Sequence, residues 1–194
     1  MKKRRVLFGA IAILAAPLML AHPGTAAEHG WASGWAHPFS GIDHLLAMIA
    51  IGLLAGQRGG KSLWALPATF IACMILGGLL ALGGVAVPLI EPAVLASVLV
   101  LGVCIALGTS VPPSAVLVLP GLFAICHGYA HVAEMTPGAS PAAYAAGFLL
   151  ATITLISIGI TIGALGRRFA PMVLTRFTGA GIATCGVLLC AHVL

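Results

Sequence analysis

The chain has 194 residues, of which 61% are hydrophobic and 7% are charged, and its mean hydropathy is +1.16. Soluble domains carry roughly 25% charged residues, so a water-soluble fold could not cover its surface with the nine basic and four acidic residues present. These values exclude a soluble globular protein. They predict a single helical membrane domain, because the chain is too short for a second one.

The amino-terminal part of the chain has the organisation of a secretory signal peptide. A basic block, Lys2 to Arg5, precedes an apolar stretch and a group of small residues. This order is typical of a cleaved signal. We expect residues 1–26 to be removed, with cleavage after Ala27 as a close alternative and an uncleaved first helix as the other interpretation. Residues 27–194 then form one membrane domain.

The remaining composition excludes several other classes. The net charge is +5, but no basic face remains once the amino-terminal block is removed, so no nucleic-acid partner is expected. No G-x-x-x-x-G-K-[ST] motif is present, so we expect no ATP hydrolysis. The five cysteines lie within apolar runs without a CxxC pair. We expect them to pack as small hydrophobic residues rather than to form disulfides or a thiolate metal site.

Apolar runs after the signal predict an all-α polytopic bundle of about six transmembrane helices. Each run is close to the ~20 residues that cross the hydrocarbon core. The first predicted helix is the least regular, because His37, Pro38 and Asp43 lie in its outer part. Gly159-x-x-x-Gly163 indicates close helix packing. The predicted helices are at about 37–56, 63–82, 92–110, 115–134, 141–166 and 177–194.

Two independent cues predict the orientation of the bundle. A cleaved signal leaves the mature amino terminus in the periplasm, so counting crossings places loops 57–62, 111–114 and 167–176 in the cytoplasm. Positive charge marks cytoplasmic loops, and these loops contain every basic residue that follows the signal: Arg58, Lys61, Arg167, Arg168 and Arg176. We therefore expect a multi-pass inner-membrane protein with both mature termini in the periplasm.

Ionisable side chains gather at the opposite, periplasmic end in this topology. The four acids are Glu28, Asp43, Glu91 and Glu134, and the histidines of the mature chain lie at a similar level or about one turn deeper. Charged groups in a membrane are costly unless they are paired, solvated or coordinated, which makes them functional candidates.

Two clusters of these residues stand out. In the first, His37 and His44 are seven residues apart and Asp43 precedes His44; on a helix the two imidazoles share a face, although Pro38 and Gly41 make the start irregular. Neutral imidazole with carboxylate is a donor set for Zn, Ni, Co or Fe(II). A proton relay uses the same residue types, and the spacing does not exclude it.

The second cluster is His127, His131 and Glu134, at positions i, i+4 and i+7 of a predicted helix, which places all three on one stripe. His127 lies about one turn deeper than His131 and is expected either to bind metal or to orient a neighbour. Outside the clusters, Glu91 is either a ligand or an ordinary interfacial acid, and His192 is expected to be incidental.

The new amino terminus carries a further hypothesis. Cleavage after Ala26 makes His29 the third residue of the mature chain. A free amine, two deprotonated amides and this imidazole then form a square-planar set suited to Ni(II) or Cu(II). The alternative is a solvated tail in which Glu28 and His29 have no role.

Two strings resemble a known family. HPFSGIDHLLAMIAIGLLA resembles the amino-terminal signature of the HupE/UreJ family of hydrogenase and urease accessory proteins, and HGYAHVAE resembles its second motif. The resemblance extends from the signal to the last helix. It implies a nickel permease of the inner membrane, with cobalt as the cargo of some relatives. It also implies functional roles for His37, Asp43, His44, Phe70, Glu91, His131 and Glu134, and the first string also contains Met48, one helical turn after His44.

The function expected from the resemblance is movement of Ni²⁺, or alternatively Co²⁺, from periplasm to cytoplasm for hydrogenase or urease assembly. No prosthetic group is implied, and cytoplasmic nickel chaperones are candidate partners. The main alternative is an intramembrane zinc hydrolase, because His and Asp clusters also build catalytic zinc sites. A metal chaperone or sensor that binds without transport is the third interpretation.

Overall fold

The computed structural model describes residues 26–135, 138–169 and 172–191, and all regular elements in these ranges are helical. The prediction of an all-α bundle is confirmed. The predicted signal peptide falls almost entirely outside the described residues. The helices are α2 (Ala26–Ala36), η2 (His37–Phe39), α3 (Ile42–Arg58), α4 (Ser62–Leu82), α5 (Ile90–Leu107), η3 (Gly108–Ser110), α6 (Pro113–Ala133), α7 (Pro141–Phe169) and α8 (Met172–Cys190).

The described part of the chain has five helices long and apolar enough to cross a membrane, namely α4, α5, α6, α7 and the Val173–Cys190 part of α8. A sixth crossing is possible as a broken one, because Gly30–Phe39 and Ile42–Arg58 pass the same test together but are bent by 79°. These helices make the protein a multi-pass membrane protein. The predicted number of about six therefore holds when the bent pair is counted as one crossing.

The predicted boundaries of the four middle helices agree with the structure within a few residues. The first long helix differs: it begins at Ile42 instead of at His37, because Gly41 adopts an extended conformation and interrupts the helix. The last helix begins at Met172, five residues before the predicted start at 177. Helix α2 was not expected, since its sequence AAEHGWASGWA has too few apolar residues to indicate a crossing.

Glycines bring α3 and α7 into backbone contact. Gly52 and Gly56 of α3 face Gly159 and Gly163 of α7, and a Cβ on any of the four would overlap backbone atoms of the other helix. Small residues at such interfaces allow close approach in a membrane, where dispersion forces depend on contact. The expectation that Gly159-x-x-x-Gly163 serves packing is confirmed. The two helices run parallel, because the contacts advance in the same direction along both.

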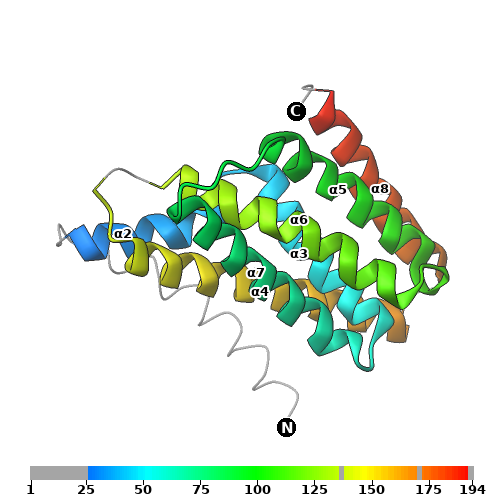
Figure 1. Ribbon diagram of the computed structural model, residues 1–194. Coiled ribbons are helices and arrows are strands. Elements are labelled where there is room, and N and C mark those ends of the chain that lie inside the picture. The colour runs from blue at the N-terminus through cyan, green and yellow to red at the C-terminus, as the bar shows by residue number, and fades with distance from the viewer. Residues whose placement is uncertain (1–25, 136–137, 170–171, 192–194) are drawn as a thin grey trace, which may run out of the picture.

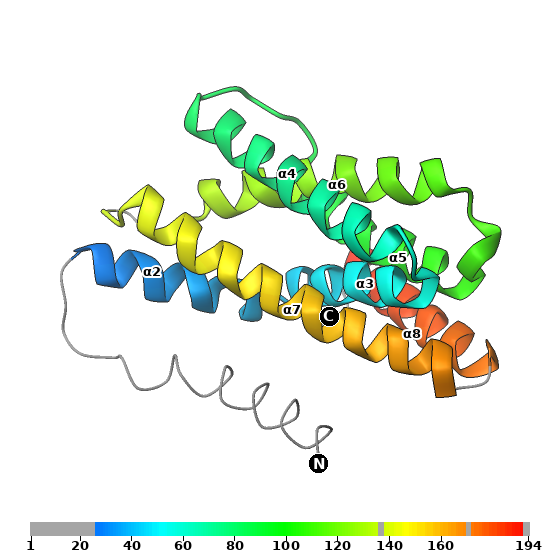
Figure 2. The same cartoon turned by 90° about the horizontal axis from the view of Figure 1, so that it is seen from below.

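The other helices also associate in pairs. Gly77 and Gly128 bring α4 against α6, while Gly102 and Gly186 bring α5 against α8. Figure 1 shows these pairs around the more central α3. In Figure 2, α2 and α3 follow one another along the length of α7. As a result, α7 contacts the chain both before and after the break between η2 and α3.

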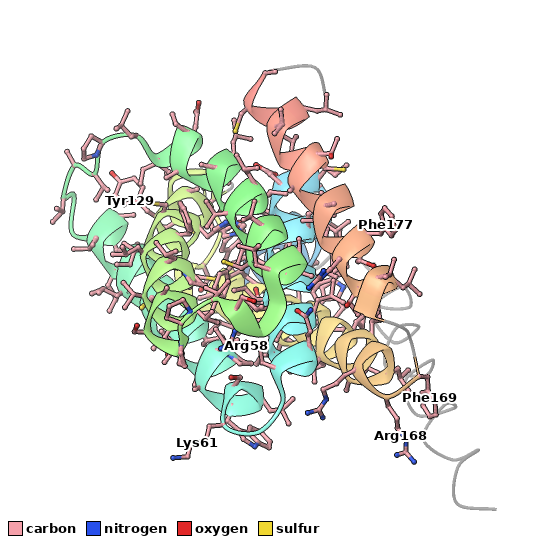
Figure 3. The ribbon with its side chains drawn as sticks, turned by 90° about the vertical axis from the view of Figure 1, so that its right-hand side faces the viewer. Arg58, Lys61, Tyr129, Arg168, Phe169 and Phe177 are labelled. Atoms are coloured by element: carbon pink, nitrogen blue, oxygen red, sulfur yellow. The ribbon has the colours of Figure 1, made fainter. Side chains whose placement is uncertain are left out.

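The charges lie at opposite ends of the bundle. Arg58 ends α3, Arg167 and Arg168 lie in the last turn of α7, and Lys61 precedes α4. Figure 3 shows Arg58, Lys61 and Arg168 at this end. Asp43 and Glu91 lie in the first turns of α3 and α5, and Glu134 follows α6, at the other end. The cysteines are free, as expected: Cys73, Cys104, Cys126, Cys185 and Cys190.

Candidate metal site

The interruption between η2 and α3 positions the first cluster. Pro38 starts the short 3-10 turn, and Gly41 then adopts φ −110° and ψ 123° before α3 begins. A Cβ on Gly41 would lie 2.6 Å from Asp43 Oδ1 and 3.2 Å from His44 Nδ1. The backbone angles suit any residue, but a side chain at this position would push the Asp43 carboxylate away from its place beside His44.

Asp43 fixes the orientation of His44. Its Oδ1 accepts a hydrogen bond from the His44 backbone N–H at 2.8 Å and another from His44 Nδ1 at 2.9 Å. Because a carboxylate accepts, Nδ1 carries the proton and Nε2 keeps its lone pair. His44 Nε2 is buried and has no hydrogen-bond partner among the described residues. A carboxylate that holds one ring nitrogen while the other is free is the usual arrangement around a metal-binding histidine.

Helix α6 provides the second cluster. His131 is 1% exposed, and neither of its ring nitrogens has a hydrogen-bond partner in the described structure. Its ring lies 3.9 Å from that of Phe148 and 4.3 Å from that of His44, between centroids. Leaving both nitrogens of a buried imidazole without a partner is costly. This cost indicates a site that is completed by a ligand.

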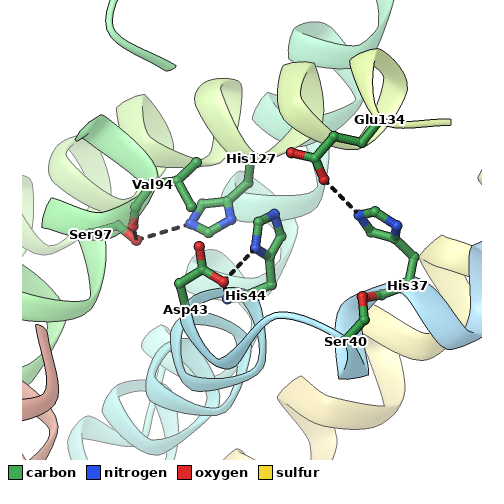
Figure 4. A network of polar contacts seen from close by, with 8 residues as sticks. All are labelled: His37, Ser40, Asp43, His44, Val94, Ser97, His127 and Glu134. Carbon is green, nitrogen blue, oxygen red and sulfur yellow. Dashed lines mark hydrogen bonds and ion pairs between the residues drawn. The ribbon is translucent and has the colours of Figure 1, made fainter. Parts of the chain in front are cut away.

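The two clusters form one site (Figure 4). His37, His44 and His131 each offer a ring nitrogen, and these three atoms lie within 4.8 Å of one another. Nitrogens bound to one tetrahedral metal ion at ~2.1 Å are about 3.4 Å apart, so small side-chain rotations bring them into range. Glu134 Oε2 lies 3.2 Å from His37 Nε2. Glu134 and Asp43 are therefore placed to orient imidazoles, in addition to any direct contact with an ion.

His127 lies beside this site and is oriented by Ser97 of α5. The Ser97 hydroxyl donates to the Val94 carbonyl at 2.6 Å, and Ser97 Oγ lies 2.9 Å from His127 Nε2. Since the single hydroxyl proton is already used, Nε2–H donates to Oγ, and Nδ1 keeps the lone pair. This buried Nδ1 has no described partner, and the ring centroid is 5.0 Å from that of His44. No pattern in the sequence had indicated Ser97.

Phe70 and Met48 lie close to the site. Phe70 is fully buried, and its ring lies 6.0 Å from that of His127. Met48 follows His44 by one helical turn in α3, and its sulfur accepts a hydrogen bond of 3.5 Å from Thr152 Oγ1. Met48 and Thr152 thus form a buried polar contact between α3 and α7, one turn beyond His44.

An apolar cavity of about 220 Å³ opens beside His131, between α4, α6 and α7. Tyr144 and Phe148 line it together with His131. The Tyr144 ring lies 5.9 Å from that of His37, and its hydroxyl has no hydrogen-bond partner among the described residues. Neither aromatic residue was predicted, because no pattern in the sequence indicated that this part of α7 lies beside the histidines.

Other predicted residues are not brought to this site. Glu91 is exposed at the start of α5 and makes no hydrogen bond or ion pair with any residue that the structure describes. His29 belongs to α2, but its side chain, like His192, lies outside the described part of the structure. The amino-terminal hypothesis for His29 therefore stays a prediction.

The fold and the site define a class: a multi-pass membrane protein whose buried imidazoles gather near one end of a helical bundle. The chain belongs to the HupE/UreJ family, since the family described as HupE / UreJ protein matches residues 10–189. A relative, Protein HupE of Rhizobium leguminosarum bv. viciae, is 37% identical over 180 residues, which cover 92% of this chain and 94% of the relative. No solved structure matches. The resemblance inferred from the two motifs is confirmed.

Proposed function

We propose that this protein is an inner-membrane permease that moves Ni²⁺, with Co²⁺ as the alternative cargo, from the periplasm to the cytoplasm. The observation that carries the proposal is the group of three imidazole nitrogens, from His37, His44 and His131, within 4.8 Å of one another. Imidazole suits nickel, cobalt and zinc among the divalent metals. The destination would be hydrogenase or urease assembly, with cytoplasmic nickel chaperones as partners.

The exposure of the site supports transport rather than permanent storage. The His37 and Glu134 side chains are 19% and 52% exposed, while His44 and His131 are buried behind them. An incoming ion can exchange its water for these groups one at a time. A conducting pathway must bind its ion strongly enough to admit it and weakly enough to release it.

A route inward follows from the same geometry. The free Nδ1 of His127 is the next nitrogen beyond His44, and the Met48 sulfur lies one turn further along α3. Beyond them the core is apolar. We propose that His127 receives the ion from the three outer imidazoles.

The orientation is part of the proposal. The arginines and Lys61 would lie on the cytoplasmic side, where positive residues are retained, and the imidazoles on the periplasmic side. Both mature termini would then be periplasmic.

An intramembrane zinc hydrolase is the alternative function. Three histidine ligands with an open fourth position are the pattern of many catalytic zinc sites, and the three clustered imidazoles fit it. Such an enzyme would retain one tightly bound metal ion after purification and dialysis. A permease would lose it.

Uptake of ⁶³Ni by nickel-limited cells that lack their own high-affinity systems tests the proposal. The intact gene should restore uptake, and His44→Ala, Asp43→Ala, His131→Ala and Glu134→Ala should each abolish most of it at similar protein levels. His192→Ala is the matched control and should behave as wild type. Full uptake by two or more of the four variants would refute the proposed site.

A further inference from the structure

The end of the bundle opposite the imidazoles contains a cavity of about 620 Å³ lined by three arginines. Arg58 comes from the end of α3, Arg167 from the end of α7 and Arg176 from the first turns of α8. None of the three forms an ion pair within the described structure, whose acidic side chains lie at the other end. Three like charges around one cavity repel one another unless an anion joins them.

One of the arginines is held in place by a hydrogen bond, and a second lies close against the chain. Arg58 Nη1 donates to the Gly108 carbonyl at 2.9 Å, which fixes the guanidinium and leaves its other N–H groups free. The Arg167 guanidinium lies against Gly59, where a Cβ would collide with it and where φ is 68°. Gln57 also lines the cavity, and its Oε1 has no hydrogen-bond partner among the described residues. The cavity thus offers one fixed guanidinium and two further ones as donors for an anion, and one acceptor for a hydroxyl.

The cavity continues onto the outer surface of the bundle. A neighbouring cavity of about 550 Å³ shares Arg176 and Leu107 with it and extends over Val173 and Phe177. Phe177 is 69% exposed, and Figure 3 shows its ring projecting from α8 away from the bundle. This surface faces acyl chains in a membrane protein. One molecule can therefore place an anionic group in the arginine cavity and a hydrocarbon chain along α8.

We propose that this cavity binds an anionic phospholipid. Its phosphate would be held by Arg58, Arg167 and Arg176, a headgroup hydroxyl would donate to Gln57 Oε1, and an acyl chain would lie over Phe177. Guanidinium groups bind phosphate oxygens in pairs, and basic pockets between membrane helices commonly bind anionic headgroups. The proposal does not depend on the metal cargo, and three arginines would repel a divalent cation.

Native mass spectrometry of the purified full chain, with added phosphatidylglycerol or phosphatidylcholine, tests this site. Wild type should retain phosphatidylglycerol and lose phosphatidylcholine. The double variant Arg167→Gln/Arg176→Gln should bind phosphatidylglycerol roughly twenty-five-fold more weakly, at about fivefold for each arginine. The matched control is Lys61→Gln/Arg168→Gln, which removes the same charge from exposed positions that do not line the cavity. The control should bind as wild type.

Further variants separate a lipid from a free anion and from misfolding. Phe177→Ala should weaken retention of phosphatidylglycerol, and inorganic phosphate should not displace the lipid. If the double variant fails to fold, Arg176→Gln alone, at an exposed position, should weaken binding about fivefold. Equal binding by wild type and the arginine variants, or equal loss in the control, would refute the site. Displacement of the lipid by inorganic phosphate would show that the cavity binds a free anion instead.

Discussion

At the scale of single residues, the site separates groups that can bind a metal ion from groups that orient them. Asp43 holds His44, Ser97 holds His127, and Glu134 faces His37. For His44 and His127 the partner occupies one ring nitrogen, and the other has no hydrogen-bond partner in the described structure. Outer groups of this kind commonly change metal affinity by about 10- to 100-fold when they are removed.

Ser97→Ala tests this orienting role. The variant leaves His127 Nε2–H buried without an acceptor, which should cost about 1–3 kcal/mol of stability. We also expect a higher nickel concentration for half-maximal ⁶³Ni uptake, because the ring can adopt the other tautomer. Ser157→Ala is the control, since that exposed hydroxyl bonds only to the Ile153 carbonyl of its own helix. An unchanged half-saturation in Ser97→Ala would remove Ser97 from the proposed pathway.

Uptake should also depend on pH. An imidazole must be neutral to bind metal, and protons compete with the ion for the ring nitrogens, so lowering the pH from about 7.5 to about 5.5 should reduce initial ⁶³Ni uptake. The effect should be reversible when the pH is restored. If the initial rates are equal at the two pH values, imidazoles do not limit the entry of the ion.

At the scale of elements, the sequence predicts where the long helices lie in the chain, but not which helices pack against one another. Apolar runs identified the long helices because each must be lipid-compatible over its own length, and the i, i+4, i+7 spacing placed His127 and His131 on one face. Helix α2 could not be predicted, because Gly34 packs on Tyr144 and Gly147 packs on Trp31, contacts with a distant part of the chain. Ser97 and Tyr144 were missed for the same reason.

The break before α3 is the element on which the first cluster depends. Gly41→Ala would place its Cβ 2.6 Å from Asp43 Oδ1, which displaces the carboxylate from His44. We expect most ⁶³Ni uptake to be lost while expression and thermal stability stay near wild type, since the change is at the edge of the bundle. Normal uptake would show that this contact is not required.

The α3–α7 contact is the element on which the fold depends. Gly159→Leu should destroy it, because the side chain would overlap the Ile49 carbonyl and the backbone of α3. We expect little folded protein by detergent size-exclusion chromatography. Gly181→Ala in α8 is the control, because a Cβ there meets no atom within 4 Å, and it should be neutral or stabilising by up to about 1 kcal/mol. Similar yields of both variants would contradict the importance of this interface.

At the scale of the whole molecule, the two ends carry opposite chemistry, with imidazoles and acids at one and arginines at the other. Because positive residues are retained in the cytoplasm, the arginine end should be cytoplasmic and the imidazole end periplasmic. Six crossings from a periplasmic amino terminus then place the carboxyl terminus in the periplasm as well. Alkaline phosphatase, which is active only in the periplasm, should be active when fused after Leu194. Activity of a cytoplasmic reporter at that position would contradict the six-crossing topology.

The parallel pairing of α3 with α7 has a consequence for biogenesis. A ribosome delivers α3 to the membrane long before α7, so Gly52 and Gly56 must wait for Gly159 and Gly163, with more than ninety-five residues of chain synthesised in between. Helix α4 likewise waits for α6. The extensive contacts of α3 with α7 and of α4 with α6 therefore cannot form while the helices are inserted as successive hairpins. The imidazole site, which needs α3, α6 and the beginning of α7, is completed only when most of the polypeptide has been inserted.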